Sequence, residues 1–302
     1  TYGIASSSYH AIRSLQEAAR DAPEAVKRAI TRDFYVDDLM SGKQKTLEAK
    51  HFILALHSHL LKYEMPIRKW ASSDASIIAE LPVELRQDEL AFNIGDKDHV
   101  VKTLGLKWIP VTDMFIFTVD HVLPNQTDSL ESGKTITKRS MLSDISKIFD
   151  PMGWLVPVTL KLKLMMQAAW LQKVDWDSPL PKDISCTFLL WRNNLVSLRQ
   201  ISIHRLVCSD FSTSSNQLHV FCDASQAAYA ACIYLRTEDQ VTGGVQVSLL
   251  TSKSKVAPLK QVSLPRLELC AALLGSRLYL AVTRALSKID VPISSVFGWT
   301  DA

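Results

Sequence analysis

The stretch Phe34-Tyr35-Val36-Asp37-Asp38-Leu39 decides how the first half of the chain is organised. Two adjacent carboxylates follow three residues that favour β-strands, so the pattern predicts a short hairpin with Asp37 and Asp38 at or just past its tip. Carboxylates gathered there repel one another unless a cation lies between them, and Mg²⁺ is the natural candidate because it prefers hard oxygen ligands. An isolated Asp-Asp pair is more often a plain acidic turn, and this alternative stays open for the pair alone.

Length and composition predict a globular protein of two or three domains. The chain has 302 residues, of which 47% are hydrophobic, and a formal net charge of +3. This charge is too small to indicate nucleic-acid binding by itself, so any electrostatic footprint must come from local clusters of Lys and Arg. No run approaches eighteen apolar residues and no signal peptide begins the chain, so we expect a soluble, cytoplasmic protein without a membrane partner.

The cysteine pattern excludes two further classes of protein. The five cysteines form an odd set without a C-x-x-C pair. Neither a zinc module nor a disulfide framework is indicated, and reduced thiols are expected. The positions are Cys186, Cys208, Cys222, Cys232 and Cys270.

The first 136 residues combine helical and extended patterns. Residues 9–31 predict two helices broken at Pro23, and residues 46–62 predict another helix after the acids. Short strands are expected at Ile67–Trp70, Ile77–Leu81, Val100–Ile109 and Met114–Val119. A sheet that carries acids, with helices covering its back, is typical of an α+β domain. Around Gly105, a bulge in an ordinary strand and a close approach to nucleic acid are equally supported.

Three helices are predicted in the middle of the chain. The first begins at Thr137 and ends before Pro151, and the second runs from about Pro157 to Gln172. Their expected buried stripes are Leu142, Ile145 and Phe149 in the first helix, and Leu160, Leu164, Ala168 and Leu171 in the second. A third helix is expected around residues 188–199. The polar run 209–216 then reads as a linker before a new domain.

A second set of acids follows this linker. Asp223 ends a hydrophobic strand, Glu268 lies in the first turn of a helix that begins near Pro265, and Asp301 follows a later strand. The predicted buried stripe of that helix is Leu267, Ala271, Leu274 and Leu278. The separations are 45 and 33 residues. Cutting a phosphodiester requires grouped carboxylates that hold cations about 4 Å apart. The alternative is that the three acids merely cap secondary structure.

Several motifs together resemble the BEL/Pao class of retrotransposon Pol polyproteins. Tyr-Val-Asp-Asp at residues 35–38 resembles the catalytic hairpin of reverse transcriptases, and residues 2–8 resemble their nucleotide- and template-positioning segment, with Ser8 where the family usually has Pro. Residues 67–70, 104–108 and 148–153 are similar to segments of the same class. Phe-Cys-Asp-Ala-Ser, Leu-Pro-Arg-Leu-Glu-Leu and Trp-Thr-Asp resemble the ribonuclease H acids, in the correct order.

This resemblance implies a fold and a division into domains. We expect an α+β reverse transcriptase palm and thumb or connection, followed by an α/β ribonuclease H-like domain with a mixed sheet. The expected boundaries are 1–136 for the C-terminal part of the palm, 137–208 for the thumb or connection, 209–216 for the linker and 217–302 for a ribonuclease H-like domain truncated at its C-terminus. A solvated basic face explains the helices after residue 137 equally well.

The resemblance also implies residue roles and partners. Asp37 and Asp38, and separately Asp223, Glu268 and Asp301, would be catalytic and bind Mg²⁺ or Mn²⁺. Nucleic-acid contacts would come from Tyr2, Gly3, Tyr35, Gly105, Trp108, Lys138 and Arg139. The partners would be an RNA template, a DNA primer, an RNA–DNA hybrid, deoxynucleoside triphosphates and the rest of the Pol polyprotein, in the cytoplasm or in virus-like particles.

The rival readings are a non-catalytic nucleic-acid-binding remnant and an aspartic peptidase. A peptidase needs an Asp-Thr-Gly or Asp-Ser-Gly loop, and the chain contains neither. The family's first polymerase Asp and fourth ribonuclease H acid are expected outside the chain. We therefore expect this chain alone not to polymerise DNA.

Overall fold

The computed structural model describes residues 4–86, 101–103, 106–117, 119, 122, 135–208 and 210–301. The chain forms two compact units. The first comprises Thr1–Ile116 with Ile203–Arg205, and the second comprises Phe117–Ser202 with Leu206–Ala302.

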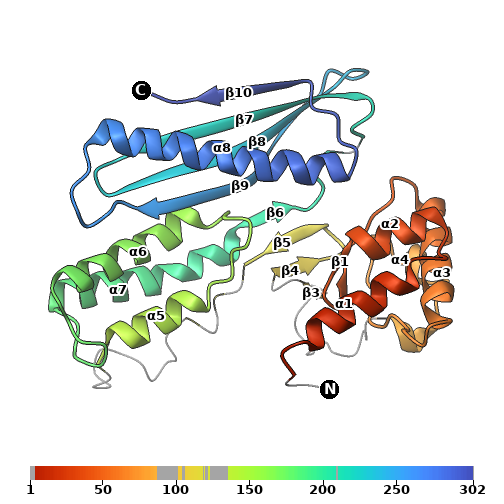
Figure 1. The fold of residues 1–302 in the computed structure, drawn as a ribbon, viewed down its shortest axis with the longest axis horizontal. Helices are drawn as coiled ribbons and strands as arrows, with labels where there is room; N and C mark the ends of the chain where they lie inside the picture. The colour runs from red at the N-terminus through yellow and green to blue at the C-terminus, as the bar shows by residue number, and fades with distance from the viewer. Residues whose placement is uncertain are drawn as a thin grey trace. The chain divides into compact units, whose positions relative to one another are not determined.

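The first unit is built on helices that surround one apolar core (Figure 1). Its helices are α1 (Ser7–Ala18), α2 (Glu24–Arg32), α3 (Thr46–Leu61) and the short α4 (Ala75–Ile78). The predicted break at Pro23 and the predicted helix after the acids are both confirmed, because Pro23 caps α2 and α3 begins at Thr46. The core is formed mainly by Val26, Ile30, Phe52, Leu56 and Leu60.

Two short sheets complete the first unit. The hairpin consists of β1 (Phe34–Tyr35) and β2 (Asp38–Leu39). A four-stranded sheet has the order β3-β4-β5-β6, with β3 at Val101–Thr103, β4 at Leu106–Ile109, β5 at Met114–Ile116 and β6 at Ser202–His204.

Three strand predictions for this unit are wrong. Residues 100–109 are not one strand, because Thr103 pairs with Leu106 across two antiparallel strands. The stretch predicted as a strand at 77–81 begins inside α4, where the Asp74 side chain accepts the Ser76 amide and starts a helix. Residues 67–70 contribute an isolated bridge between Trp70 and Arg86. Short apolar runs without strict alternation do not distinguish strand from helix.

The second unit contains a mixed four-stranded sheet in the order β10-β7-β8-β9. Strand β7 spans Ser214–Ala224, β8 spans Ala228–Asp239, β9 spans Val245–Val256 and β10 spans Ser295–Trp299. Strand β10 is parallel to β7, whereas β7, β8 and β9 pair antiparallel. The predicted mixed sheet is therefore confirmed.

Helix α8 (Leu264–Lys288) lies across one face of this sheet (Figure 1). It packs on β7 and β8 through a stripe that includes Leu267, Ala271 and Leu274, as the sequence predicts. At Gly275 a side chain is excluded, because an added Cβ would lie 2.2 Å from the Sγ of Cys222. By length and composition alone α8 could cross a membrane. The packed stripe is instead the arrangement expected of a core helix.

A helical layer, α5 (Lys138–Ser146), α6 (Val156–Leu171) and α7 (Lys182–Asn194), lies beside β9 (Figure 1). The predicted buried stripes are wrong in the first two helices. Helix α5 buries Lys138, Met141 and Asp144 and leaves Leu142 exposed. Helix α6 buries Leu162, Met165, Met166 and Ala169, while Leu171 is exposed. Helix α6 is apolar almost all round, so its periodicity does not select one face.

The segment before α6 joins this helical layer to the free edge of β9. The Ser252 amide donates to Met152 O at 2.9 Å, and the Trp154 indole N–H donates to Leu249 O at 3.0 Å. Gly153 fits only without a side chain, since an added Cβ would lie 1.9 Å from Ser252 O. The layer and the sheet thus share one compact unit, and β7 begins at Ser214, inside the run predicted as a linker. The domain boundaries themselves stay a prediction.

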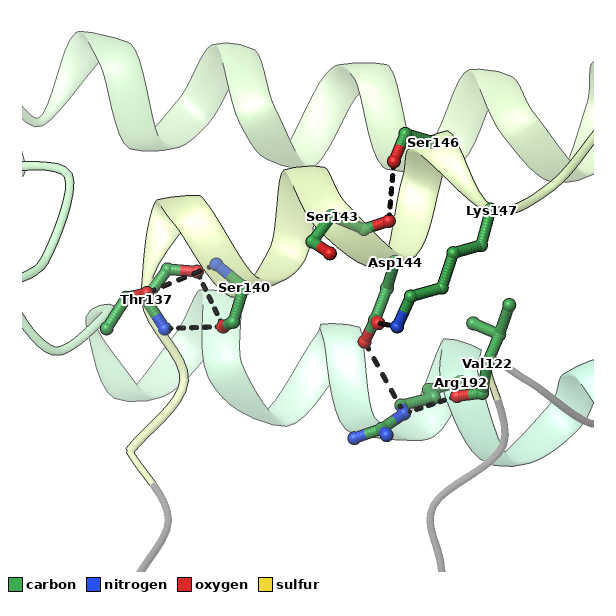
Figure 2. A network of polar contacts seen from close by, with 8 residues as sticks. All are labelled: Val122, Thr137, Ser140, Ser143, Asp144, Ser146, Lys147 and Arg192. Carbon is green, nitrogen blue, oxygen red and sulfur yellow. Dashed lines mark hydrogen bonds and ion pairs between the residues drawn. The ribbon is translucent and has the colours of Figure 1, made fainter.

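Buried charges hold the helical layer together (Figure 2). The Asp144 carboxylate on α5 accepts Lys147 Nζ at 2.8 Å and lies 3.6 Å from Arg192 Nε on α7. The same Arg192 nitrogen donates to Val122 O at 2.7 Å. A capping box between Thr137 and Ser140 starts α5. This network ties two helices and the segment at Val122 into a fixed arrangement.

Candidate active site

The first pair of predicted catalytic acids lies at the hairpin, as the sequence predicts. Tyr35 pairs with Asp38, so Val36 and Asp37 form the two-residue turn. Both acids and Tyr35 are exposed. Val36 has a φ of 58°, which is rare for a β-branched residue and stores backbone strain of about 1–3 kcal/mol. The acids are thus presented to solvent on a strained turn held by very short strands.

A third carboxylate, which the sequence analysis did not consider, lies at the base of this hairpin. Asp33 contacts Arg32 Nε at 2.5 Å and accepts the Ser41 hydroxyl at 2.7 Å. Its backbone carbonyl also accepts the Met40 amide at 3.0 Å. Asp33 therefore closes the hairpin.

The second pair of acids is brought together by parallel register. Trp299 at the end of β10 pairs with Phe221 of β7. Asp223 lies two residues further along β7, and Asp301 lies two residues past the end of β10, so both acids lie at the same end of the sheet. Neighbouring strands are about 4.8 Å apart, so a continuation of this register past Trp299 would bring two carboxylates within reach of one cation.

The third predicted acid stands apart from this pair. On β7, Cys222 faces α8, and side chains alternate along a strand, so Asp223 points to the other face. Glu268 is half-buried in the first turns of α8. Across the described residues, no group of three His, Cys, Asp or Glu side chains is close enough to hold a metal ion.

The donor set fits a divalent cation only in part. Magnesium is commonly held by one or two carboxylates, with waters and substrate phosphates as the remaining ligands. Asp223 and Asp301 match that requirement as a pair. They do not by themselves form the full two-cation site that the sequence predicted.

Aromatic side chains continue from the strand-end acids along the same sheet face. His219, Phe221, Phe297 and Trp299 stand at alternate positions of β7 and β10, and their rings are nearly parallel with centroids 5.0–6.5 Å apart. The Trp299 indole N–H donates to His219 Nδ1 at 3.1 Å. This bond leaves the imidazole proton on Nε2 in the neutral form. The ladder joins β7 and β10 through stacked rings on this face of the sheet.

Sequence reasoning missed this aromatic ladder. The available signal was the alternation of His219 and Phe221 before one acid, and of Phe297 and Trp299 before the other. Because the two runs are far apart in sequence, only their parallel pairing shows that the rings meet.

Two lysines lie at the same end of the sheet as the acids. Ala230 pairs with Asp223 on one side and with Ser254 of β9 on the other. Lys253 and Lys255 flank Ser254 and are exposed. Because Ser254 shares the face of Asp223 through Ala230, the two lysines beside it point to the opposite face of the sheet. Their positive charge therefore lies at the same end of the sheet as Asp223 but not on its face.

The tryptophan and basic residues predicted to contact nucleic acid already have partners. Trp108 donates to Asp113 Oδ1 at 2.9 Å, and the Arg205 guanidinium lies 5.5 Å from its ring centre. Lys138 is 3% exposed, with Nζ 4.1 Å from the Trp170 ring centre. A buried ammonium over an aromatic ring is stabilised by the cation–π interaction.

Arg139, in contrast, is exposed. It forms a two-pronged pair with Asp177, at 2.7 and 2.9 Å. These hydrogen bonds hold the pKa of Asp177 below its ordinary value and raise the pKa of Arg139. Tyr2, Gly3 and Gly105 lie outside the described residues.

A family comparison agrees with the architecture of the second unit. Residues 137–302, more than half of the chain, match the family described as Pao retrotransposon-like RNaseH-like domain. Among solved structures, the chain is similar to the foamy viral protease-reverse transcriptase dRH in complex with ds DNA, with 13% identity and a TM-score of 0.47. The match covers 92% of this chain and 41% of that one. No curated protein matches.

Proposed function

Because the chain belongs to the family of Pao retrotransposon RNaseH-like domains, we propose that its second unit hydrolyses the RNA strand of an RNA–DNA hybrid. The observation that supports this proposal is the parallel pairing of β10 with β7, which directs Asp223 and Asp301 to the same end of the sheet. Hydrolysis of a phosphodiester needs such paired carboxylates, because they hold the divalent cation that neutralises charge developing on the phosphate.

The residues of the second unit would have separate roles in this hydrolysis. Asp223 and Asp301 would hold Mg²⁺ or Mn²⁺, which lowers the pKa of a bound water and polarises the phosphate. The water oxygen forms the new bond to phosphorus while the bond to the ribose oxygen breaks. Selectivity for RNA comes from contacts to 2′-hydroxyl groups.

The first unit supports a second, finer proposal. Asp37 and Asp38 belong to the site for nucleotidyl transfer from deoxynucleoside triphosphates to a primer on an RNA template, with Tyr35 packed near the primer end. The support is the exposed, strained hairpin that presents both acids. The chain by itself is proposed to be inactive as a polymerase and to work with the remainder of the Pol polyprotein, in the cytoplasm or in virus-like particles.

Cleavage of a labelled RNA–DNA hybrid with Mg²⁺ or Mn²⁺ tests the nuclease proposal. We expect Asp223→Asn and Asp301→Asn each to lower the rate by at least about 100-fold, since each removes a cation ligand. Asp37→Asn is the matched control, with an unchanged cleavage rate expected. The same series is made in a chain extended past Ala302, where the resemblance puts a fourth acid.

The binding-only alternative has its own outcome in this experiment. If folded wild-type chains, extended or not, bind the hybrid as tightly as Asp223→Asn and none cleaves it, the protein is a non-catalytic binding remnant. Detectable primer extension by the chain alone would contradict the polymerase part of the proposal.

A further inference from the structure

The face of α8 turned away from the sheet carries exposed leucines. Leu269, Leu273 and Leu280 are 73%, 51% and 49% exposed, and they lie opposite the packed stripe of Leu267, Ala271 and Leu274. In Figure 1 no other element of the second unit is drawn over this face. Three large apolar side chains along one open stripe indicate a contact surface.

Two of these leucines, each followed by an arginine four residues later, are seven residues apart. Leu273 and Arg277 recur as Leu280 and Arg284. Seven residues are just under two helical turns, so each pair repeats on the same side of the helix about 10.5 Å further along. A seven-residue apolar repeat with charges at its margin is the pattern by which one helix packs along another.

The charge on this face has one sign. Arg266, Arg277 and Arg284 are exposed, and none of their guanidinium groups is ion-paired within the described part of the chain. The single acidic residue of α8, Glu268, is half-buried on the side towards the sheet. The face therefore joins an apolar stripe to an uncompensated row of positive charge.

We propose that the outer face of α8, comprising Leu269, Leu273, Leu280, Arg277 and Arg284, docks an amphipathic helix of a partner protein. That helix would have an apolar stripe bordered by Asp or Glu. Leucines pack against apolar side chains, and the flanking arginines select acidic partners.

The same chemistry argues against two other occupants. A second copy of this chain would set arginine against arginine, and like charges along a helical seam disfavour pairing. Nucleic-acid backbones would satisfy the arginines but leave the leucine stripe exposed. Since Asp223 points to the opposite face of the sheet, the docked helix would leave the acidic edge free, and this inference does not depend on nuclease activity.

Synthetic helices of about four heptads test the proposal. The probe has Leu at both core positions of each heptad and Glu at the flanking positions, and a second peptide has Lys in place of Glu. Binding of each labelled peptide to the full chain is followed by fluorescence anisotropy. We expect the Glu peptide to bind at least about tenfold more tightly than the Lys peptide, because only Glu complements the arginines.

Variants show whether binding uses this face. Arg277→Glu with Arg284→Glu is expected to reverse the preference between the two peptides, a gain that unfolding could not produce. Leu273→Ser with Leu280→Ser is expected to weaken binding of the Glu peptide by about tenfold or more. Lys161→Glu with Lys182→Glu, an equal charge change on exposed sites of α6 and α7, should change neither.

Three results would overturn the proposal. One is equal binding of the Glu and Lys peptides, or no binding of either. Another is binding to phosphatidylserine vesicles that depends on Leu273 and Leu280 while the peptides do not bind, which would assign the face to a lipid surface. The last is loss of hybrid binding in the arginine variant alone, with the leucine variant unaffected, which would assign it to nucleic acid.

Discussion

The two pairs of acids differ in what holds them. Asp37 and Asp38 are neighbours in sequence and stand on a hairpin of two-residue strands with a strained turn. Asp223 and Asp301 come from distant parts of the chain, but Asp223 lies near the end of β7 and Asp301 follows β10, in a sheet that α8 covers and on which aromatic rings stack. Two acids that are adjacent in sequence are therefore not held more rigidly than two acids that come from distant strands of one packed sheet. Precision comes from the surrounding packing and register.

Gly153→Ala should have the largest effect on stability. It tests the contact between the segment before α6 and β9, in the sheet that carries Asp223. The variant combines an unfavourable φ with a clash against Ser252 O on β9, and we expect the free energy of unfolding to fall by roughly 2–4 kcal/mol. Gly243→Ala is the control, because it has a φ of 69° and no atom within 4 Å. Denaturant unfolding of both variants separates the clash from the backbone cost, and equal losses would contradict the close contact with β9.

Asp144→Ala should have the next largest effect, since it removes a buried carboxylate that lies against the half-buried Arg192. We expect a loss of about 2–3 kcal/mol, somewhat below that of a fully buried pair because Lys147 is partly solvated. Asp177→Ala removes the exposed partner of Arg139 and should leave stability nearly unchanged. Thermal melting checks both, and a similar melting temperature for the two variants would show that burial of the network is unimportant.

Val36→Gly changes the turn of the hairpin that carries Asp37 and Asp38. It is expected to raise the stability of that hairpin and not to lower it. Glycine relieves the positive φ of a β-branched residue but adds freedom to the unfolded chain, so the expected gain for the hairpin is at most about 1 kcal/mol. Lys69→Gly, with a φ of 57° and no β-branch, should gain less. Hydrogen exchange of the Met40 amide reports the change, and faster exchange in Val36→Gly would contradict the strain.

The smallest expected effects are on how stability depends on pH. They have opposite signs for Asp150 in the second unit and Asp74 in the first unit. Burial raises the pKa of Asp150, against the opposing effect of the Leu155, Trp154 and Gly153 amides. Its folded form holds the proton more tightly than the unfolded chain, so its contribution weakens as pH rises from about 4 through the raised pKa. Hydrogen bonds from Ser76 lower the pKa of Asp74 in the first unit, so its contribution is lost as pH falls through that lowered pKa.

Asn substitutions separate these two contributions. Asp150→Asn should remove the fall in stability with rising pH, and Asp74→Asn should remove the loss on acidification. Denaturant unfolding from pH 3 to 6 measures both slopes against the wild-type chain. Slopes that do not change in either variant would show that neither carboxyl titrates differently on folding.

Local chemistry in the sequence determined much of the architecture. Pro23, the capping residues at 137–140 and Pro265 placed helix ends, and the Val36-Asp37 turn placed the hairpin, because these signals act within a few residues. Strict spacing also predicted the packed stripe of α8. Where helix α6 was apolar on every side, the sequence had no information about which face would be buried.

Long-range contacts decided the rest. The sequence placed Asp223 and Asp301 at strand ends, but only the parallel pairing of β7 with β10 brought them to the same end of the sheet. Only alternation along β7 turned Asp223 away from α8. Lys138 was predicted to face nucleic acid, yet it is buried beside Trp170, a residue more than thirty positions away. Local propensities act within a few residues, whereas register and burial depend on which distant surfaces meet, and this is fixed only when the whole unit packs.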